Sequence, residues 1–92
     1  MSNPAPAADS PETILRQCAA AAPEPWYPRD YAAAAGIDRD RLDPSLDALR
    51  LAGLIRLTDW VRGKGQGYAL TPDGARLLND PRGLARALDG RA

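Results

Sequence analysis

The stretch AAAAGIDRDRLDPSLDALRLAGLIRL, residues 32–57, decides the fold of this 92-residue chain. Its alanine-rich start ends at Gly36, a residue suited to the left-handed conformation that terminates many helices. Leucines then recur at positions 42, 46 and 49, the i, i+4 and i+7 spacing of one helix face. Gly53 closes this second segment, and a strand-like run begins directly after it. The stretch predicts two helices joined by a tight turn and followed by a strand.

The residues on either side complete the order of elements. Upstream, Ser10 and Pro11 form a capping pair at the start of a first helix, which two prolines end. Downstream, two strand-like runs flank GKGQG, residues 63–67, whose glycines predict the loop of a hairpin. Thr71 then caps a further helix that begins at Pro72. The predicted helices span about residues 11–22, 28–35, 39–52 and 72–78, and the predicted strands span 54–62 and 68–71.

The predicted fold is α+β and mostly helical, with a three-helix core, a two-stranded β-hairpin and a C-terminal helix. A chain of this length supports one domain, and we place it at residues 11–80. Residues 1–10 are rich in Pro and Ala and are expected to form a disordered lead. Residues 81–92 are expected to form a short C-terminal helix or a linker.

The composition excludes several classes of function. The sequence has no histidine, which removes catalytic triads and imidazole-built metal sites. Its one cysteine, Cys18, forms no internal disulfide and no CxxC pair for zinc or redox work. No apolar run approaches the ~20 residues that span a bilayer. We therefore expect a cytoplasmic module that is not an enzyme, holds no metal or cofactor and does not insert into a membrane.

The net charge is zero, but the charges are unevenly distributed along the sequence. Residues 1–49 carry four arginines against eight acids, a net charge of −4. Residues 50–68 carry four cations against Asp59, a net charge of +3, and residues 69–92 add +1. A basic segment is the expected place for a polyanion to bind. The charges therefore direct attention to the predicted hairpin rather than to the helices before it.

This order of elements resembles the winged helix-turn-helix family, of the MarR or PadR kind. Residues 32–57 and GKGQGYALTPDGARLL, residues 63–78, carry the resemblance. It implies that the third helix enters the major groove of duplex DNA, with Arg41 reading guanine and Ser45 bonding a phosphate. It also implies that the hairpin is a wing whose cations contact phosphates or the minor groove, and that the protein forms a homodimer. The wing cations are Arg56, Arg62 and Lys64.

The third helix departs from the pattern of a base-reading helix. Asp43 and Asp47 would have to approach a polyanion, and Pro44 replaces a polar side chain. An alternative interpretation is structural: Asp38 or Asp40 caps the helix, and Asp43 complements its dipole. The sequence therefore predicts weak DNA binding in which the wing, rather than the third helix, makes the main contacts.

The side chain of Trp60 has two possible orientations, whereas one position is expected for each of the other aromatic residues. With strict alternation along the first strand, Trp60 shares the outer face with Arg56 and Arg62, which is typical of an interface. With a bulge, Trp60 instead turns inward and supplements the core. Trp26 and Tyr27, bracketed by prolines, are expected to plug the core, and Cys18 is expected to be a small buried hydrophobe.

A second function class stays open. The chain could be an interaction module that binds a protein partner through the acidic face at Asp43 and Asp47, or through Trp60 on the wing. A further resemblance supports this hypothesis. EPWYPRDYA, residues 24–32, and LRLAGLIRLTDWVRGKGQGYALTPDGA, residues 49–75, resemble the soluble N-terminal segment of some bacterial rhomboid-type membrane proteases. That resemblance carries over no catalytic residue.

Overall fold

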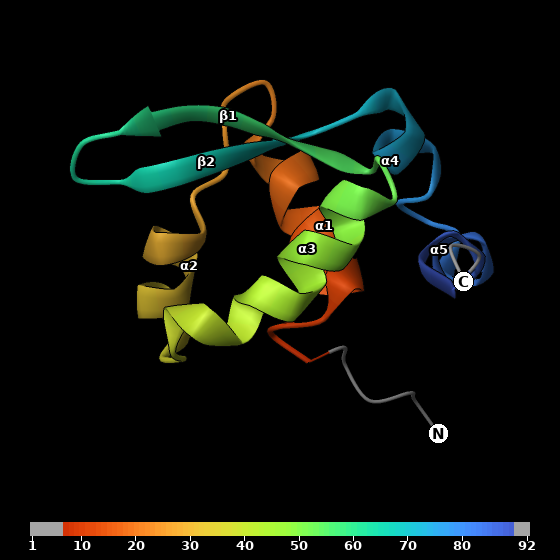
Figure 1. The fold of residues 1–92 in the computed structure, drawn as a ribbon, viewed down its shortest axis with the longest axis horizontal. Helices are drawn as coiled ribbons and strands as arrows, with labels where there is room; N and C mark the ends of the chain where they lie inside the picture. Colours follow the sequence, from red (N-terminus) through yellow and green to blue (C-terminus); the bar gives the residue numbers. More distant parts are fainter. Residues whose placement is uncertain (1–6, 90–92) are drawn as a thin grey trace.

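The computed structural model describes residues 7–89, and these residues follow the predicted order of elements (Figure 1). The helices lie beneath a two-stranded antiparallel hairpin, and the last helix packs at one side of the molecule. The α+β class and the hairpin are therefore confirmed. The elements are α1 (Pro11–Ala21), α2 (Pro28–Ala35), the 3-10 turn η1 (Arg39–Leu42), α3 (Asp43–Leu51), β1 (Ile55–Val61), β2 (Gly65–Leu70), α4 (Pro72–Arg76) and α5 (Pro81–Asp89).

Local signals set the helix ends. The Ser10 hydroxyl accepts a hydrogen bond of 3.1 Å from the Thr13 amide, and the Thr71 hydroxyl accepts one of 3.1 Å from the Gly74 amide. These side chains satisfy amide groups that the first turn of a helix leaves unpaired. Gly36 ends α2 with φ of 71°. Asp38, rather than Asp40, caps the third helical segment, because its carboxylate accepts from the Asp40 amide.

The third helix differs from the prediction of a single α-helix. Its first four residues form the 3-10 turn η1, and α3 proper starts at Asp43. Pro44, the second residue of α3, has no amide hydrogen and cannot donate to a carbonyl four residues earlier. The change from 3-10 to α geometry at this proline follows from the missing donor.

The hairpin is longer than predicted, because β2 begins at Gly65 instead of residue 68. The turn between the strands is therefore confined to Arg62, Gly63 and Lys64. Gly63 and Gly65 both have φ of 84°, a backbone conformation that side chains disfavour. The loop was predicted over residues 63–67, but only Gly63 lies in the turn, whereas Gly65 begins β2 and Gly67 lies inside it.

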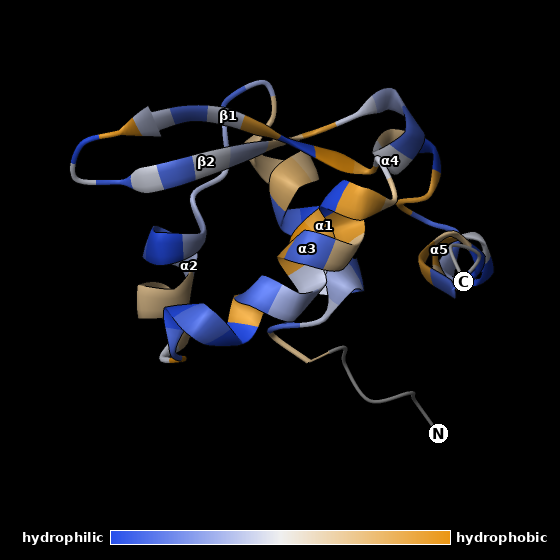
Figure 2. Cartoon of the chain, viewed as in Figure 1, coloured by the Kyte–Doolittle hydropathy of each residue, from blue (hydrophilic) through white to orange (hydrophobic). Residues whose placement is uncertain are grey.

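The core lies where the apolar side of the helices meets the hairpin (Figure 2). The predicted leucine face of η1–α3 is confirmed, since Leu42, Leu46 and Leu49 are all buried. Trp26 is also buried and exchanges two backbone hydrogen bonds of 2.8 Å with Tyr68, so an isolated β-bridge joins the connector to β2. The buried apolar residues are Ile14, Leu15, Cys18, Trp26, Ala32, Leu42, Leu46, Leu49, Leu54, Ile55, Tyr68 and Leu84.

The two ends of the chain pack onto this core where they are described. Residues 7–10, part of the predicted lead, are hydrogen-bonded to the helices, as detailed below. Residues 1–6 and 90–92, which hold the rest of the lead and the last residues of the tail, lie outside the described residues. The segment 81–89 forms helix α5, whose Leu84 joins the core.

Candidate nucleic-acid interface

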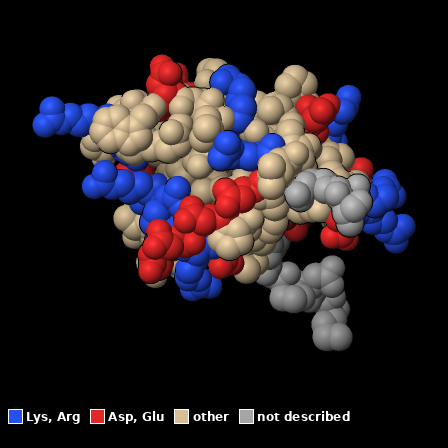
Figure 3. All heavy atoms as spheres, in the orientation of Figure 1, with Lys and Arg blue, Asp and Glu red and all other residues tan. Residues whose placement is uncertain are grey.

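The hairpin and the segment η1–α3 share one face of the molecule. In Figure 3 red acidic atoms form a belt across the front of the molecule, below the hairpin, with blue basic atoms at its end and on the hairpin above. The acids that η1–α3 and its cap supply are Asp38, Asp40, Asp43 and Asp47, and all four are exposed. This arrangement follows from the leucine face, because burying Leu42, Leu46 and Leu49 leaves the polar positions of the helix in solvent.

The two predicted DNA-reading residues of this segment already have partners within the chain. The Arg41 guanidinium pairs with the Asp9 carboxylate at 3.2 Å. The Ser45 hydroxyl donates a 2.7 Å hydrogen bond to the Asp9 carbonyl oxygen. Sequence reasoning missed Asp9, because no spacing rule connects a residue before α1 to one in α3. Arg41 and Ser45 stay predicted DNA contacts, but both are engaged in this structure.

The predicted protein-contacting acids differ in their surroundings. Asp43 pairs with Arg39 at 2.8 Å, one helical turn away, so its charge is partly balanced. Asp47 is exposed and, among the described residues, has no cation within 4.0 Å. Their role in binding a protein stays a prediction.

The outward face of α3 carries an apolar stripe between its charged residues, a feature that the sequence reasoning missed. Pro44, Ala48 and Leu51 follow i, i+4 and i+7 spacing on the side opposite the buried leucines. Leu51 is 69% exposed, the largest value for a large apolar side chain among the described residues. The same spacing rule that found the core leucines would have found this second stripe. The exposed polar side chains beside this stripe are those of Asp43, Asp47 and Arg50.

A β-bulge decides the position of Trp60. Leu57 pairs with Tyr68 and Trp60 pairs with Gln66, so Thr58 and Asp59 together face the single residue Gly67. A Cβ at position 67 would meet Tyr27 at 3.0 Å and Pro25 at 3.2 Å and would also strike the Thr58 hydroxyl. Gly67 therefore allows the connector, β1 and β2 to approach one another closely.

Neither expectation for Trp60 is fully correct. Strict alternation is wrong, because the bulge puts Trp60 opposite Gln66, which lies on the same side of β2 as the buried Tyr68. Trp60 is nevertheless 65% exposed instead of joining the core. The turn of the hairpin projects beyond the helices in Figure 1, and Trp60 lies two residues before that turn. Trp60 is thus turned to the core side and remains open to solvent.

The basic residues of the hairpin are available for a polyanion. Arg56, Arg62 and Lys64 are exposed, and none has an acid within 4.0 Å in the described part of the chain. The Lys64 ammonium lies 5.0 Å from the centre of the Tyr27 ring, a cation–π contact. Arg29 of α2 also lies beside the turn, since its Cδ is 3.9 Å from the position of a Cβ on Gly65. Sequence reasoning missed Arg29, which only the packing of α2 against β2 brings to the hairpin.

The structure offers little for other chemistry. Burial raises the pKa of the Cys18 thiol to about 12, so this group is a neutral core side chain at ordinary pH. No three His, Cys, Asp or Glu residues between positions 7 and 89 lie together as metal ligands would. No described helix combines the length and apolar character needed to cross a membrane.

Comparisons with known proteins agree with this geometry at the level of the fold. MarR of Staphylococcus aureus, solved in complex with salicylate and kanamycin, superposes on 89% of the chain with a TM-score of 0.60 and 23% identity. A MarR-family transcriptional regulator from Silicibacter pomeroyi covers 90% of the chain, with a TM-score of 0.62 and 20% identity. The chain has the winged-helix fold of these MarR regulators.

The fold assigns names to the parts of the interface. In a winged-helix fold the β1–β2 hairpin, residues 55–70, takes the place of the wing, and η1–α3, residues 39–51, takes the place of the recognition helix. The chain spans 57% and 55% of the two neighbours' lengths, and neither neighbour is named as an enzyme. No family model and no curated protein matches the sequence. The rhomboid resemblance is not shown by these comparisons and stays a prediction.

Proposed function

We propose that this chain is the winged-helix unit of a DNA-binding regulator, and that it holds duplex DNA mainly by the backbone phosphates, through its wing. The observation that carries the proposal is the set of exposed cations at the wing, free of acidic partners among the described residues. They lie on one hairpin and the helix beside its turn, so a single backbone can meet several of them. These cations are Arg29, Arg56, Arg62 and Lys64.

The recognition helix supports phosphate binding over base reading. Specific readout needs side chains that hydrogen-bond base edges. The outward stripe of this helix presents Pro44, Ala48 and Leu51, and Asp47 beside it repels phosphates. Arg50, in the last turn of α3, is exposed and can meet a phosphate. Phosphate contacts position a protein on DNA without reading its sequence. We therefore expect weak, sequence-tolerant and strongly salt-dependent binding.

A titration of random-sequence duplex over a series of salt concentrations tests this proposal. Each phosphate contact adds about 0.9 to the slope of log affinity against log salt. We expect the double variant Arg62→Ala/Lys64→Ala to lower that slope by about 2 and to weaken binding at low salt. The matched control is Arg82→Ala/Arg86→Ala, which removes two exposed cations from α5 instead. No binding by the wild-type chain at low salt, or an equal loss in the control, contradicts the proposal.

A second candidate function is binding of a protein partner. Among residues 7–89, four large apolar side chains are exposed, and three of them lie on β1 of the wing, which favours this alternative. We expect the matching surface of such a partner to be apolar, because the side chains that would contact it are apolar. Two results together would favour protein binding. The affinity for DNA would be unchanged in the Arg62→Ala/Lys64→Ala variant, and Trp60→Ala would no longer bind the protein partner. The four exposed side chains are Leu51, Leu57, Trp60 and Val61.

We also propose that the chain forms a homodimer through α1 and α5. An open cavity of about 240 Å³ lies between the start of α1 and α5, lined on the α5 side by Pro81, Leu84, Ala85 and Leu88. A second copy could bury this apolar surface. Sedimentation equilibrium over a range of concentrations measures the assembly, and a chain that stays monomeric throughout contradicts the homodimer.

A further inference from the structure

A short segment before α1 lies across the helix-turn-helix. This strap, Ala7–Asp9, receives hydrogen bonds from two different helices. The Tyr31 hydroxyl of α2 donates to the Ala8 carbonyl at 2.8 Å, and the Ser45 hydroxyl of α3 donates to the Asp9 carbonyl at 2.7 Å. The Arg41 guanidinium of η1 pairs with the Asp9 carboxylate at 3.2 Å. The strap therefore contacts each element of the helix-turn-helix.

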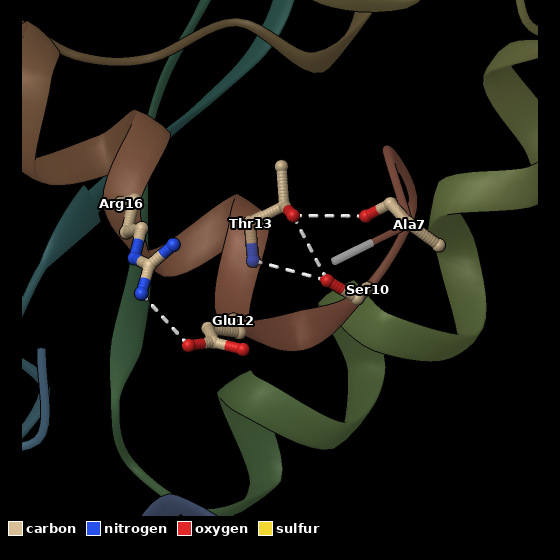
Figure 4. A network of polar contacts seen from close by, with 5 residues as sticks. All are labelled: Ala7, Ser10, Glu12, Thr13 and Arg16. Atoms are coloured by element: carbon tan, nitrogen blue, oxygen red, sulfur yellow. Dashed lines mark hydrogen bonds and ion pairs between the residues drawn. The ribbon is translucent and has the colours of Figure 1, made fainter. Parts of the chain in front are cut away.

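The strap is fixed at its other side by the cap of α1 (Figure 4). The Thr13 hydroxyl donates a 2.8 Å hydrogen bond to the Ala7 carbonyl, and the Ser10 hydroxyl donates one of 2.9 Å to the Thr13 hydroxyl. The Ser10 amide donates to the same Ala7 carbonyl at 3.0 Å. Folding of α1 thus places Asp9 beside the recognition helix.

The chemistry of the contact matches that of a phosphate. A carboxylate, like a phosphate, is an anion whose oxygens accept hydrogen bonds from a guanidinium. Arg41 and Ser45 are the two residues of the recognition helix expected to contact DNA, and both bind Asp9 here. We infer that the strap is an autoinhibitory contact, in which Asp9 holds Arg41 in place of a DNA phosphate. This inference rests on the proposed function.

The exposure of the pair makes the contact reversible. The Arg41 side chain is 61% exposed and the Asp9 side chain 27% exposed, so water and salt reach both charges. Exposed ion pairs are weak and screened by salt. A polyanion that brings several phosphates to the wing and the recognition helix can therefore displace one carboxylate. The strap lowers the affinity for DNA without preventing binding.

The test compares DNA affinity in the full chain with and without the Asp9 carboxylate. We expect Asp9→Ala to tighten binding of random-sequence duplex at low salt by about two- to fivefold, the range set by a weak exposed ion pair. The salt slope should rise by about 0.9, because Arg41 gains one phosphate. Arg41→Gln should abolish this gain in the double variant Asp9→Ala/Arg41→Gln.

The matched control is Asp73→Ala, which also removes an acid paired with an exposed arginine, Arg76 of α4. An equal gain in this control would show that net charge alone acts, and would overturn the inference. If the Arg62→Ala/Lys64→Ala variant loses slope as expected while Asp9→Ala changes nothing, the strap inference fails and the wing proposal stands. Absence of DNA binding in every variant overturns both.

Discussion

The ammonium group of Lys64, at the turn of the wing, lies 5.0 Å from the centre of the Tyr27 ring in the connector between α1 and α2. Lys64 is the sole lysine of the sequence. The contact ties the end of the hairpin, which projects beyond the helices, to the connector whose Trp26 is part of the core. The turn of the wing is thus linked to the connector by this contact.

The Lys64–Tyr27 contact should be measurable in the free protein. Cation–π pairs at exposed sites contribute about 0.5–1 kcal/mol. We expect Lys64→Gln to lower the free energy of unfolding by about this amount in the wild-type background, and by much less in a Tyr27→Leu background. Urea unfolding of the four proteins of this cycle gives the coupling. Strictly additive losses would show that the ring and the ammonium do not interact.

The two tryptophans should report opposite environments. Trp26 is 6% exposed and Trp60 is 65% exposed. We expect Trp60→Phe to remove the acrylamide-quenchable part of the fluorescence and Trp26→Phe to remove the protected part. Stern–Volmer quenching of both variants measures this. Protected emission from Trp60, seen in Trp26→Phe, would mean that the bulge turns this side chain into the core after all.

Two leucines of α3 should differ sharply in their effect on stability. Leu46 is 1% exposed within the core, whereas Leu51 is 69% exposed on the outward stripe. Leu46→Ala should cost about 2–5 kcal/mol, because it removes buried apolar surface and leaves a cavity. Leu51→Ala should change the free energy of unfolding by less than about 0.5 kcal/mol. Chemical denaturation compares the two, and a large loss in Leu51→Ala would indicate a buried role, such as a dimer contact.

Replacing Gly74 in α4 with alanine should lower the free energy of unfolding. In an open helix interior this change stabilises by about 1 kcal/mol. Here a Cβ would strike the Leu54 carbonyl and approach Leu70 Cδ1 at 3.0 Å. Because backbone yields less than a side chain, we expect Gly74→Ala to destabilise by about 1–3 kcal/mol.

The control for that prediction is Gly83→Ala in α5. The atoms that a Cβ would meet there belong to the side chains of Asp80 and Leu77. The Leu77 side chain can move, and the Asp80 carboxylate can move if it gives up the 2.9 Å hydrogen bond that it accepts from the Gly83 amide. Because no backbone has to shift, the loss should be smaller than at Gly74. Thermal unfolding of both variants ranks them, and a stabilised Gly74→Ala would contradict the close packing of α4 on the β1 start.

The thiol of Cys18 should make stability fall at high pH. Burial raises its pKa from an ordinary value of 9.0 to about 12, so the folded state retains the proton more strongly than the unfolded state. The stabilisation is therefore complete below pH 9 and is lost as the pH rises toward 12. Comparing urea unfolding of the wild type and Cys18→Ala across this range isolates the thiol from other groups. Parallel pH profiles would contradict the prediction.

The sequence alone predicted the elements and the core face, because the signals for both are local. Capping at Ser10 and Thr71, the left-handed Gly36 and the leucine spacing of α3 each depend on residues within one or two helical turns. Pro44 lies within the same range, and its missing donor explains the one break in the third helix. The order of these elements was then enough to predict the winged-helix fold.

Only the tertiary structure decided what the candidate interface presents. The bulge at Thr58 and Asp59 reverses the side on which Trp60 lies, and it faces Gly67, where the connector leaves no room for a side chain. The contact of Asp9 with Arg41 joins residues 32 positions apart, and no periodicity encodes it. Strand register and ion pairs between distant segments are set by packing in three dimensions. The sequence therefore determined the scaffold, whereas the partners of Arg41, Lys64 and Trp60 came from the fold.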